Sequence, residues 1–211
     1  GADGMKNCFV VSACVKYTPE LTSLLNSLAL IGNQHDVHLI GYKLPVDFLA
    51  QIPSLPYKVN YYQVPEEEAR QYGGESEILC RKRYWYAAEW GKSYDATCIL
   101  DADMFFVRPV DQFFEIANKC KFIVGAALEQ KRIYGSIEHH KVKGVHLLEA
   151  PVWNTKDICC SPMFADMTEY EMPFKLSWQI FAEGFPETNF KAPDMEAINI
   201  EFLTHKLSDK V

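Results

Sequence analysis

Hydrophobic residues occur in short blocks along the first hundred residues, and these blocks alternate with polar stretches. The run from Cys8 to Val15 is apolar and rich in β-branched residues, which predicts a buried strand. Similar runs predict three more strands, at residues 37–42, 57–64 and 96–100. Apolar side chains at helical spacing predict helices at residues 18–31, 45–51 and 77–90. The first of these helices has Thr18 as its expected N-cap and Pro19 at its first helical position.

This alternation of strands and helices predicts an α/β fold, with a mixed, mostly parallel central sheet flanked by helices. Ligands of such sheets bind at the carboxyl ends of the strands. A loop is expected around Pro65 and the Gly73-Gly74 pair. The second half is less regular, with expected strands at residues 122–128 and 158–164, expected helices at 176–183 and 195–207, and a long polar loop at 129–150.

The composition narrows the possible partners. Hydrophobic residues make up 48% of the 211 residues, which is enough for the core of one domain and argues against disorder. The formal net charge of −7 disfavours nucleic acid as the main partner, because an acidic surface repels a phosphate backbone. The seven cysteines lie mostly in apolar runs without a C-x-x-C pair, so we expect free thiols in a cytoplasmic, reducing compartment. No membrane helix and no signal peptide are expected.

Two carboxylates, Asp101 and Asp103, follow the very apolar run at residues 96–100. Alternating residues of an extended chain point the same way, so both carboxylates could converge on one cation at the end of a strand. Their hard oxygen ligands suit Mn²⁺ or Mg²⁺. An ordinary polar turn at the end of a strand is the alternative interpretation, since a D-x-D pattern is common by chance.

The residues after the aspartate pair include Arg108-Pro109-Val110 and an amphipathic start at Asp111. With the apolar strand and Asp101-Ala102-Asp103, they resemble GT-A-type glycosyltransferases, and most closely the family of glycogenin and the bacterial galactosyltransferases. The resemblance implies a metal-dependent hexosyltransferase that uses a UDP-sugar donor and a glycan or glycoprotein acceptor. It implies one domain over residues 1–211, with a Rossmann-like nucleotide-sugar-binding half at 1–110 and an acceptor-side half at 111–211.

The same resemblance assigns donor-binding roles. In it, Asp101 and Asp103 hold the metal against the diphosphate, with Ala102 between them, while Ser12 and Ala13 lie at the turn that closes the first strand. Tyr17 is the aromatic residue that packs on uracil; a half-buried aromatic at a strand–helix junction is the alternative. Arg81 corresponds to a basic residue at the donor phosphates. Arg81 also lies on the apolar stripe of its expected helix, so a snorkelling arginine is an equal alternative.

Asp194 and Glu196 are the candidate catalytic residues, because Pro193-Asp194-Met195-Glu196 resembles the start of a late helix in this family. Either carboxylate could face the reacting sugar or the acceptor hydroxyl. An N-cap for Asp194, with Glu196 favouring the helix dipole, is the structural alternative. Met195 departs from the glutamine that is common in the family. His205 is a candidate third metal ligand, although it lies closer to this motif than the family pattern places it.

The compact length is also similar to that of the small glycosyltransferase domain of a chlorella virus capsid-glycosylating protein, which would place the chain in the host cytoplasm. Two other classes stay open. A phosphohydrolase of the haloacid dehalogenase type also carries D-x-D after a strand, but normally after the first strand and not in mid-chain. A nucleotide-sugar-binding module without turnover is the non-enzyme alternative. A sugar nucleotidyltransferase is disfavoured, because residues 12–17 contain no glycine.

Overall fold

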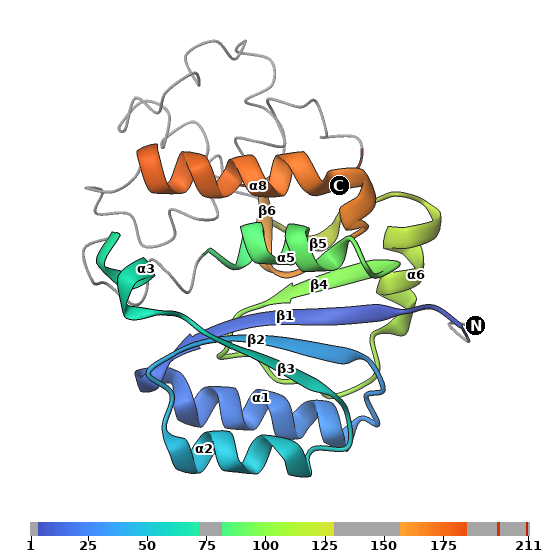
Figure 1. Ribbon diagram of the computed structural model, residues 1–211. Coiled ribbons are helices and arrows are strands. Elements are labelled where there is room, and N and C mark those ends of the chain that lie inside the picture. Colours follow the sequence, from blue (N-terminus) through green and yellow to red (C-terminus); the bar gives the residue numbers. More distant parts are fainter. Residues whose placement is uncertain (1–3, 72–81, 129–156, 185–197, 199–209, 211) are drawn as a thin grey trace.

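The computed structural model describes residues 4–71, 82–128 and 157–184, together with residues 198 and 210 (Figure 1). These residues form a six-stranded sheet with the strand order β3-β2-β1-β4-β6-β5. The strands are β1 (Asn7–Cys14), β2 (Asp36–Tyr42), β3 (Val59–Gln63), β4 (Ala96–Leu100), β5 (Val124–Leu128) and β6 (Asp157–Ala165). The first four strands are parallel, and β6 runs antiparallel to both β4 and β5. The predicted mixed, mostly parallel sheet is therefore confirmed.

Helices cover both faces of this sheet (Figure 1). One face carries α1 (Thr18–Leu30), α2 (Val46–Gln51) and α6 (Asp111–Lys119), whose buried side chains share one core cluster. In that cluster the ring of Phe114 packs edge-on against Phe9 at 5.2 Å and Phe164 at 5.0 Å between centroids. This cluster anchors α6, the helix that follows the aspartate pair, to the centre of the sheet.

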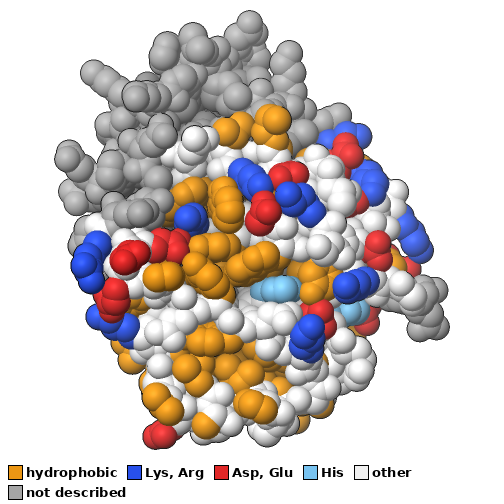
Figure 2. Space-filling view, viewed as in Figure 1, with side chains coloured by type: hydrophobic (Ala, Val, Ile, Leu, Met, Phe, Trp, Pro, Cys, Tyr) orange, Lys and Arg blue, Asp and Glu red, His pale blue; other side chains and the backbone are white. Residues whose placement is uncertain are grey.

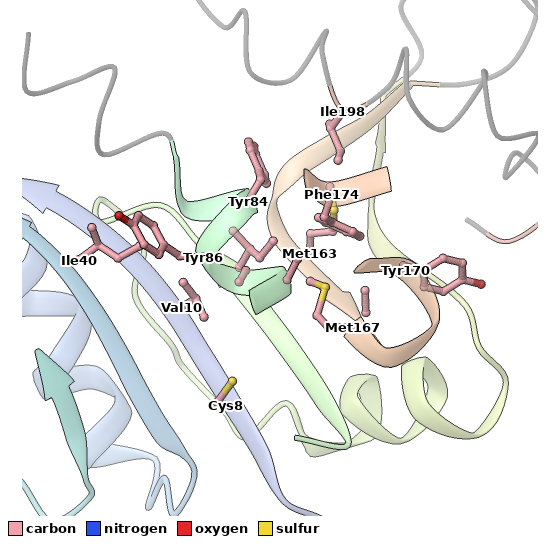
Figure 3. Close-up of a cluster of buried hydrophobic side chains, with 14 of the residues drawn as sticks. Cys8, Val10, Ile40, Tyr84, Tyr86, Met163, Met167, Tyr170, Phe174 and Ile198 are labelled. Atoms are coloured by element: carbon pink, nitrogen blue, oxygen red, sulfur yellow. The ribbon is translucent and has the colours of Figure 1, made fainter. Parts of the chain in front are cut away.

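The opposite face carries α5 (Arg83–Gly91) and α8 (Met167–Gly184), with a second core cluster between them and the sheet (Figure 3). Gly91 permits this close packing, because a Cβ there would lie 2.5 Å from Thr97 Oγ1 and 2.6 Å from Met167 Cγ. Lysines and glutamates bridge the outer surfaces of both helices. Lys175 Nζ lies 2.5 Å from Glu89 and 2.8 Å from Glu171. Charges of both signs accordingly alternate on this face (Figure 2).

All eight residues of β1 are buried, which explains why this strand reads as a continuous apolar run. Cys8 and Val10 belong to the cluster under α5 and α8, whereas Phe9 and Val11 belong to the cluster under α1 and α6. A central strand covered on both faces needs apolar side chains on both, so it shows no alternation of polar and apolar residues. Its burial fixes the position of the residues that follow it.

Two local features differ from the sequence-based expectation. The α1 helix is preceded by a 3₁₀ turn at Val15–Tyr17, so Tyr17 is the N-cap and Thr18 is the first helical residue. The Thr18 hydroxyl donates a hydrogen bond back to the carbonyl of Val15 at 2.6 Å. A short helix, α3 (Glu66–Gln71), occupies part of the expected loop after Pro65. Its three N-terminal glutamates favour helix formation there through the helix dipole.

The helix expected at residues 176–183 is longer and begins at Met167. A helix that runs through Pro173 is not expected from the sequence, since proline breaks a helix interior. The backbone leaves helical dihedrals at Tyr170, so Pro173 falls in the first turn of the segment that follows the kink, where its missing N–H is tolerated. Asp166 precedes the helix and caps it, with its Oδ1 accepting from the Thr168 backbone N–H at 3.0 Å.

Candidate active site

The aspartate pair lies at the carboxyl edge of the parallel strands, as the sequence predicted. Leu100 ends β4 and pairs in register with Val11 of β1, so Asp101 and Ser12 follow side by side at this edge. The chain turns at residues 102 and 103, so the extended backbone that the sequence predicted for the aspartate pair is not observed. Ala102 is buried, the Asp101 side chain is 42% exposed, and Asp103 is exposed. Both carboxylates are therefore accessible from solvent, while the residue between them is part of the core.

Arg83, at the first position of α5, forms an ion pair with Asp101. Its Nη2 lies 2.5 Å from Asp101 Oδ1, and its side chain is only 7% exposed. A buried guanidinium needs such an anionic partner, because the desolvated charge would otherwise be very unfavourable. Asp101 is thus approached by Arg83 from the protein interior and by solvent from outside.

The neighbouring antiparallel strand fixes the backbone of Asp101. The Asp101 N–H donates to Ser161 Oγ of β6 at 2.6 Å, and the Ser161 hydroxyl lies 2.8 Å from the sulfur of Met104. Ser161 is buried, so this bond is shielded from competition by water. The first aspartate is consequently held through both its backbone and its side chain.

The residues expected to line the donor at the end of β1 differ in accessibility. Ser12 and Ala13 are buried, so their side chains are covered by protein. Tyr17 follows in the 3₁₀ turn with 38% of its surface exposed, and the ammonium of Lys16 lies 5.1 Å from its ring centroid. Of these three residues, Tyr17 offers an aromatic surface to a ligand.

A hydrogen-bonded cluster around Glu68 joins α3, β3 and α5 on the side of Arg83. The Glu68 carboxylate accepts from Tyr86 Oη at 2.8 Å, Tyr62 Oη at 3.0 Å and Lys82 Nζ at 3.1 Å. Burial acts to raise the pKa of Glu68, but the bonds from Tyr86 and Lys82 outweigh it and hold the pKa below its ordinary value. Because Lys82 immediately precedes Arg83, this cluster fixes the start of the helix that carries Arg83.

Several predicted site residues lie outside the described residues, namely Arg81, Asp194, Glu196 and His205. Among the described residues, no group of three or more His, Cys, Asp or Glu side chains is arranged to hold a metal ion. Asp101 and Asp103 supply two carboxylate donors, and this donor chemistry fits Mn²⁺ or Mg²⁺. Both cations take further oxygen ligands from water and substrate phosphates.

Sequence reasoning missed Arg83, and it missed the hydrogen bond of Ser161 to Asp101. A signal for Arg83 was present, because it lies four residues before Ala87 and eight before Gly91, on the stripe that packs against the sheet. A charged residue on a buried stripe indicates a partner charge nearby. Arg81, two residues earlier, was instead predicted to be the basic residue at the donor phosphates. Ser161 has no comparable signal, since a serine inside an apolar strand is common.

Comparison with solved structures supports the assignment of the fold. No protein-family model and no curated protein matches the chain. Among solved structures, the apo bifunctional glycosyltransferase WbbM is similar with a TM-score of 0.64 at 10% identity, over 95% of this chain and 38% of WbbM. An active-site mutant of LgtC is similar with a TM-score of 0.60 at 11% identity, over 89% of this chain and 68% of LgtC.

Core-mannan synthase A (CmsA/Ktr4) from Aspergillus fumigatus, in a form with Mn and GDP, gives a TM-score of 0.56 at 10% identity, over 94% of this chain and 69% of that protein. None of these three is described as viral, so the structural comparison gives no support to a viral origin. Within the described part of the chain, no helix is long and apolar enough to span a bilayer. The chain thus has an α/β fold, with a mostly parallel six-stranded sheet flanked by helices, that matches the fold of GT-A glycosyltransferases.

Proposed function

We propose that this chain is a metal-dependent glycosyltransferase that transfers a hexose from a UDP-sugar to a glycan or protein acceptor. One observation carries the proposal: the accessible carboxylates of Asp101 and Asp103 follow a central strand at the ligand-binding edge of a sheet of the GT-A kind. The Mn and GDP of the core-mannan synthase structure support a divalent cation and a nucleotide diphosphate as ligands of this fold.

In this proposal Asp101 and Asp103 hold Mn²⁺ or Mg²⁺. When bound, the cation neutralises the diphosphate and makes it a better leaving group. Tyr17 stacks on the uracil ring, for which its exposed position after β1 is suitable. Ser12 and Ala13 contribute through their backbone, because their side chains are buried. Ala102, which is also buried, separates the two solvent-accessible aspartates by one residue.

The chemical step requires a group that stabilises positive charge on the sugar or takes a proton from the acceptor. Asp194 and Glu196 remain the proposed carboxylates for this role, and Arg81 remains a proposed contact of the donor phosphates. The donor half at residues 1–110, the acceptor half at 111–211 and a cytoplasmic location are parts of the same proposal. Inversion follows if Asp194 or Glu196 reaches the acceptor hydroxyl; a retaining front-face route is open if neither does.

The test is hydrolysis of a panel of UDP-sugars without acceptor, with Mn²⁺ and with EDTA. A glycosyltransferase of this kind slowly releases UDP from its own donor in Mn²⁺ and not in EDTA. Hydrolysis of simple phosphate esters in place of UDP-sugars would indicate the phosphohydrolase alternative. Binding of UDP-sugar with no release of UDP, even after long incubation with mixed glycan acceptors, would indicate a binding module and contradict the proposal.

A further inference from the structure

The Asp101 carboxylate lies between a buried cation on one side and solvent on the other. Its Oδ1 is 2.5 Å from the guanidinium of Arg83, which is almost entirely buried. Its solvent side is open, and there the carboxylate lies one residue from the exposed Asp103. A cation that binds between the two aspartates would therefore share the Asp101 carboxylate with an arginine that cannot withdraw into water.

Arg83 is held in this place by structure on both sides. Lys82, the preceding residue, is bonded to Glu68, and the Arg83 guanidinium carbon lies 5.4 Å from the ring centroid of Tyr84. The Asp101 backbone is anchored to Ser161 in β6. The ion pair therefore joins two backbone segments that are each anchored by other contacts.

The positive charge of Arg83 determines how this residue affects cation binding at Asp101. Arginine remains protonated at any pH at which the protein is folded, so its positive charge is permanent. The charge of the buried Arg83 is poorly screened by water, and a carboxylate that already neutralises a guanidinium offers less negative charge to a second cation. Arg83 accordingly opposes cation binding at Asp101. The same positive charge attracts a diphosphate that arrives at this edge.

We infer that Arg83 acts as an internal competitor for the Asp101 carboxylate, which keeps cation affinity low until a nucleoside diphosphate binds. This inference rests on the proposed function and specifies its regulation. When the diphosphate is present, its negative charges balance both the bound cation and Arg83. Cation and nucleotide then bind with positive coupling, and linkage requires that each raises the affinity of the other by the same factor. Arg83 is in this role a positioning residue for the metal site.

The experiment is calorimetric titration of Mn²⁺ into the nucleotide-free protein and into the protein saturated with UDP. Arg83→Gln and Arg83→Met remove the positive charge, and Arg83→Lys keeps it on a shorter side chain. The control is Lys92→Gln, which removes an equal charge from the other end of the same helix, where the lysine pairs with Glu89 and Glu171. Circular dichroism establishes which variants are folded, and either neutral variant is sufficient.

We expect the neutral variants to lower the Kd for Mn²⁺ without UDP at least about tenfold, equivalent to about 1.4 kcal/mol. If neither neutral variant folds, Arg83→Lys takes their place and should give a smaller decrease, because its shorter side chain holds the charge farther from Asp101. Lys92→Gln should change the Kd less than threefold, and UDP should tighten Mn²⁺ binding more in the parent than in the Arg83→Gln and Arg83→Met variants. An Mn²⁺ affinity that is unchanged or weaker in the Arg83 variants overturns the inference.

The same experiment distinguishes a failure of the proposed function from a failure of the role inferred for Arg83. If the parent protein binds no Mn²⁺, or if Asp103→Asn binds it as well as the parent does, the aspartate pair is not the cation site and the proposed function loses its basis. If the parent binds Mn²⁺ through Asp103 and the Arg83 variants show no tightening, the cation site stands and only the competitor role of Arg83 is wrong.

Discussion

The backbone N–H of Phe106 donates a hydrogen bond to the side-chain oxygen of Ser27 at 2.9 Å, which ties the segment after the aspartate pair to the last turn of α1. Ser27 is buried and its own hydroxyl donates to the carbonyl of Leu24 at 2.7 Å, so the oxygen both donates and accepts. The Phe106 ring also packs edge-on against Phe9 of β1, with 5.5 Å between the centroids. The chain leaving Asp103 is therefore fixed within three residues.

Ser27→Ala should lower the free energy of unfolding by about 1–3 kcal/mol, because it leaves the partly buried Phe106 N–H without its acceptor. The measurement is urea denaturation followed by circular dichroism. Ser23→Ala is the matched control on the same helix, since the Ser23 hydroxyl is exposed and bonds only to the Pro19 carbonyl among the described contacts. A loss of stability in Ser27→Ala no larger than in Ser23→Ala would show that the Phe106 bond contributes little.

Asp103→Asn should remove the stabilisation that UDP gives in Mn²⁺ without changing the stability of the ligand-free protein. The physical reason is that Asp103 is exposed and contributes little to packing, whereas a cation between two carboxylates needs both charges. Ligand at 100 times its dissociation constant adds about 2.7 kcal/mol, which a thermal-shift measurement readily detects. Asp47→Asn, which changes another exposed aspartate in α2, controls for net charge. Equal stabilisation by UDP in EDTA would contradict the metal bridge.

The centre of the sheet could be predicted from the sequence because β1 and β4 are buried on both faces. The run at residues 96–100 matches β4 residue for residue, and the carboxylates after it lie at the edge that a parallel sheet gives to ligands. Burial on both faces removes polar residues from the interior of a strand, so its ends are sharply marked by Asp95 and Asp101. This is why the position of the aspartate pair was predictable.

The ion pair of Arg83 with Asp101 was not predictable, because it joins residues from separate elements whose relative placement depends on the packing of α5 on the sheet. A helix periodicity indicates which residues face inward but not which partner each will meet. The start of α8 was missed for a related reason. The composition around Pro173 argues for a break, and only the kink at Tyr170 makes that proline compatible with a helix.

Tyr17→Ala should weaken UDP binding about 5- to 150-fold, because stacking of a base on an aromatic ring contributes about 1–3 kcal/mol. Tyr17→Phe keeps the ring and should bind UDP nearly as well as the parent. Isothermal titration with UDP in saturating Mn²⁺ measures both, and the Mn²⁺ affinity alone should be unaffected. An unchanged dissociation constant in Tyr17→Ala would return Tyr17 to the structural role of a half-buried N-cap residue.

Asp194→Asn should reduce turnover about 10²–10⁴-fold if Asp194 takes a proton or stabilises positive charge, since a neutral amide does neither. Asparagine is about as good an N-cap as aspartate, so the melting temperature should not change. Turnover, melting temperature and UDP affinity are measured on the same preparation. Turnover within a few-fold of the parent would identify Asp194 as a cap, and Glu196→Gln would then be the variant to measure.

The Glu68 cluster should make part of the stability sensitive to acid. Tyr62, Tyr86 and Lys82 stabilise the ionised carboxylate and hold its pKa in the folded protein below the ordinary value of 4.5. A group whose pKa is lowered by folding contributes its full stability above the pKa of the unfolded chain. That contribution decreases below about pH 4.5 and is lost as the pH falls through the lower pKa of the folded protein.

Glu68→Gln isolates this contribution. At pH 7 the variant should unfold about 1.5–3 kcal/mol more easily than the parent, the range for hydrogen bonds to charged groups. The difference should stay constant down to about pH 5.5 and then shrink as the parent's Glu68 takes up a proton, because the two side chains become similar in charge. Urea denaturation of both proteins between about pH 7 and pH 3.5 measures it. Glu66→Gln, an exposed glutamate at the start of the same helix, controls for general acid effects and should show a small difference throughout. If the Glu68→Gln difference is independent of pH, the carboxylate contributes through shape and hydrogen bonding alone, and its charge is not what holds α3 against α5.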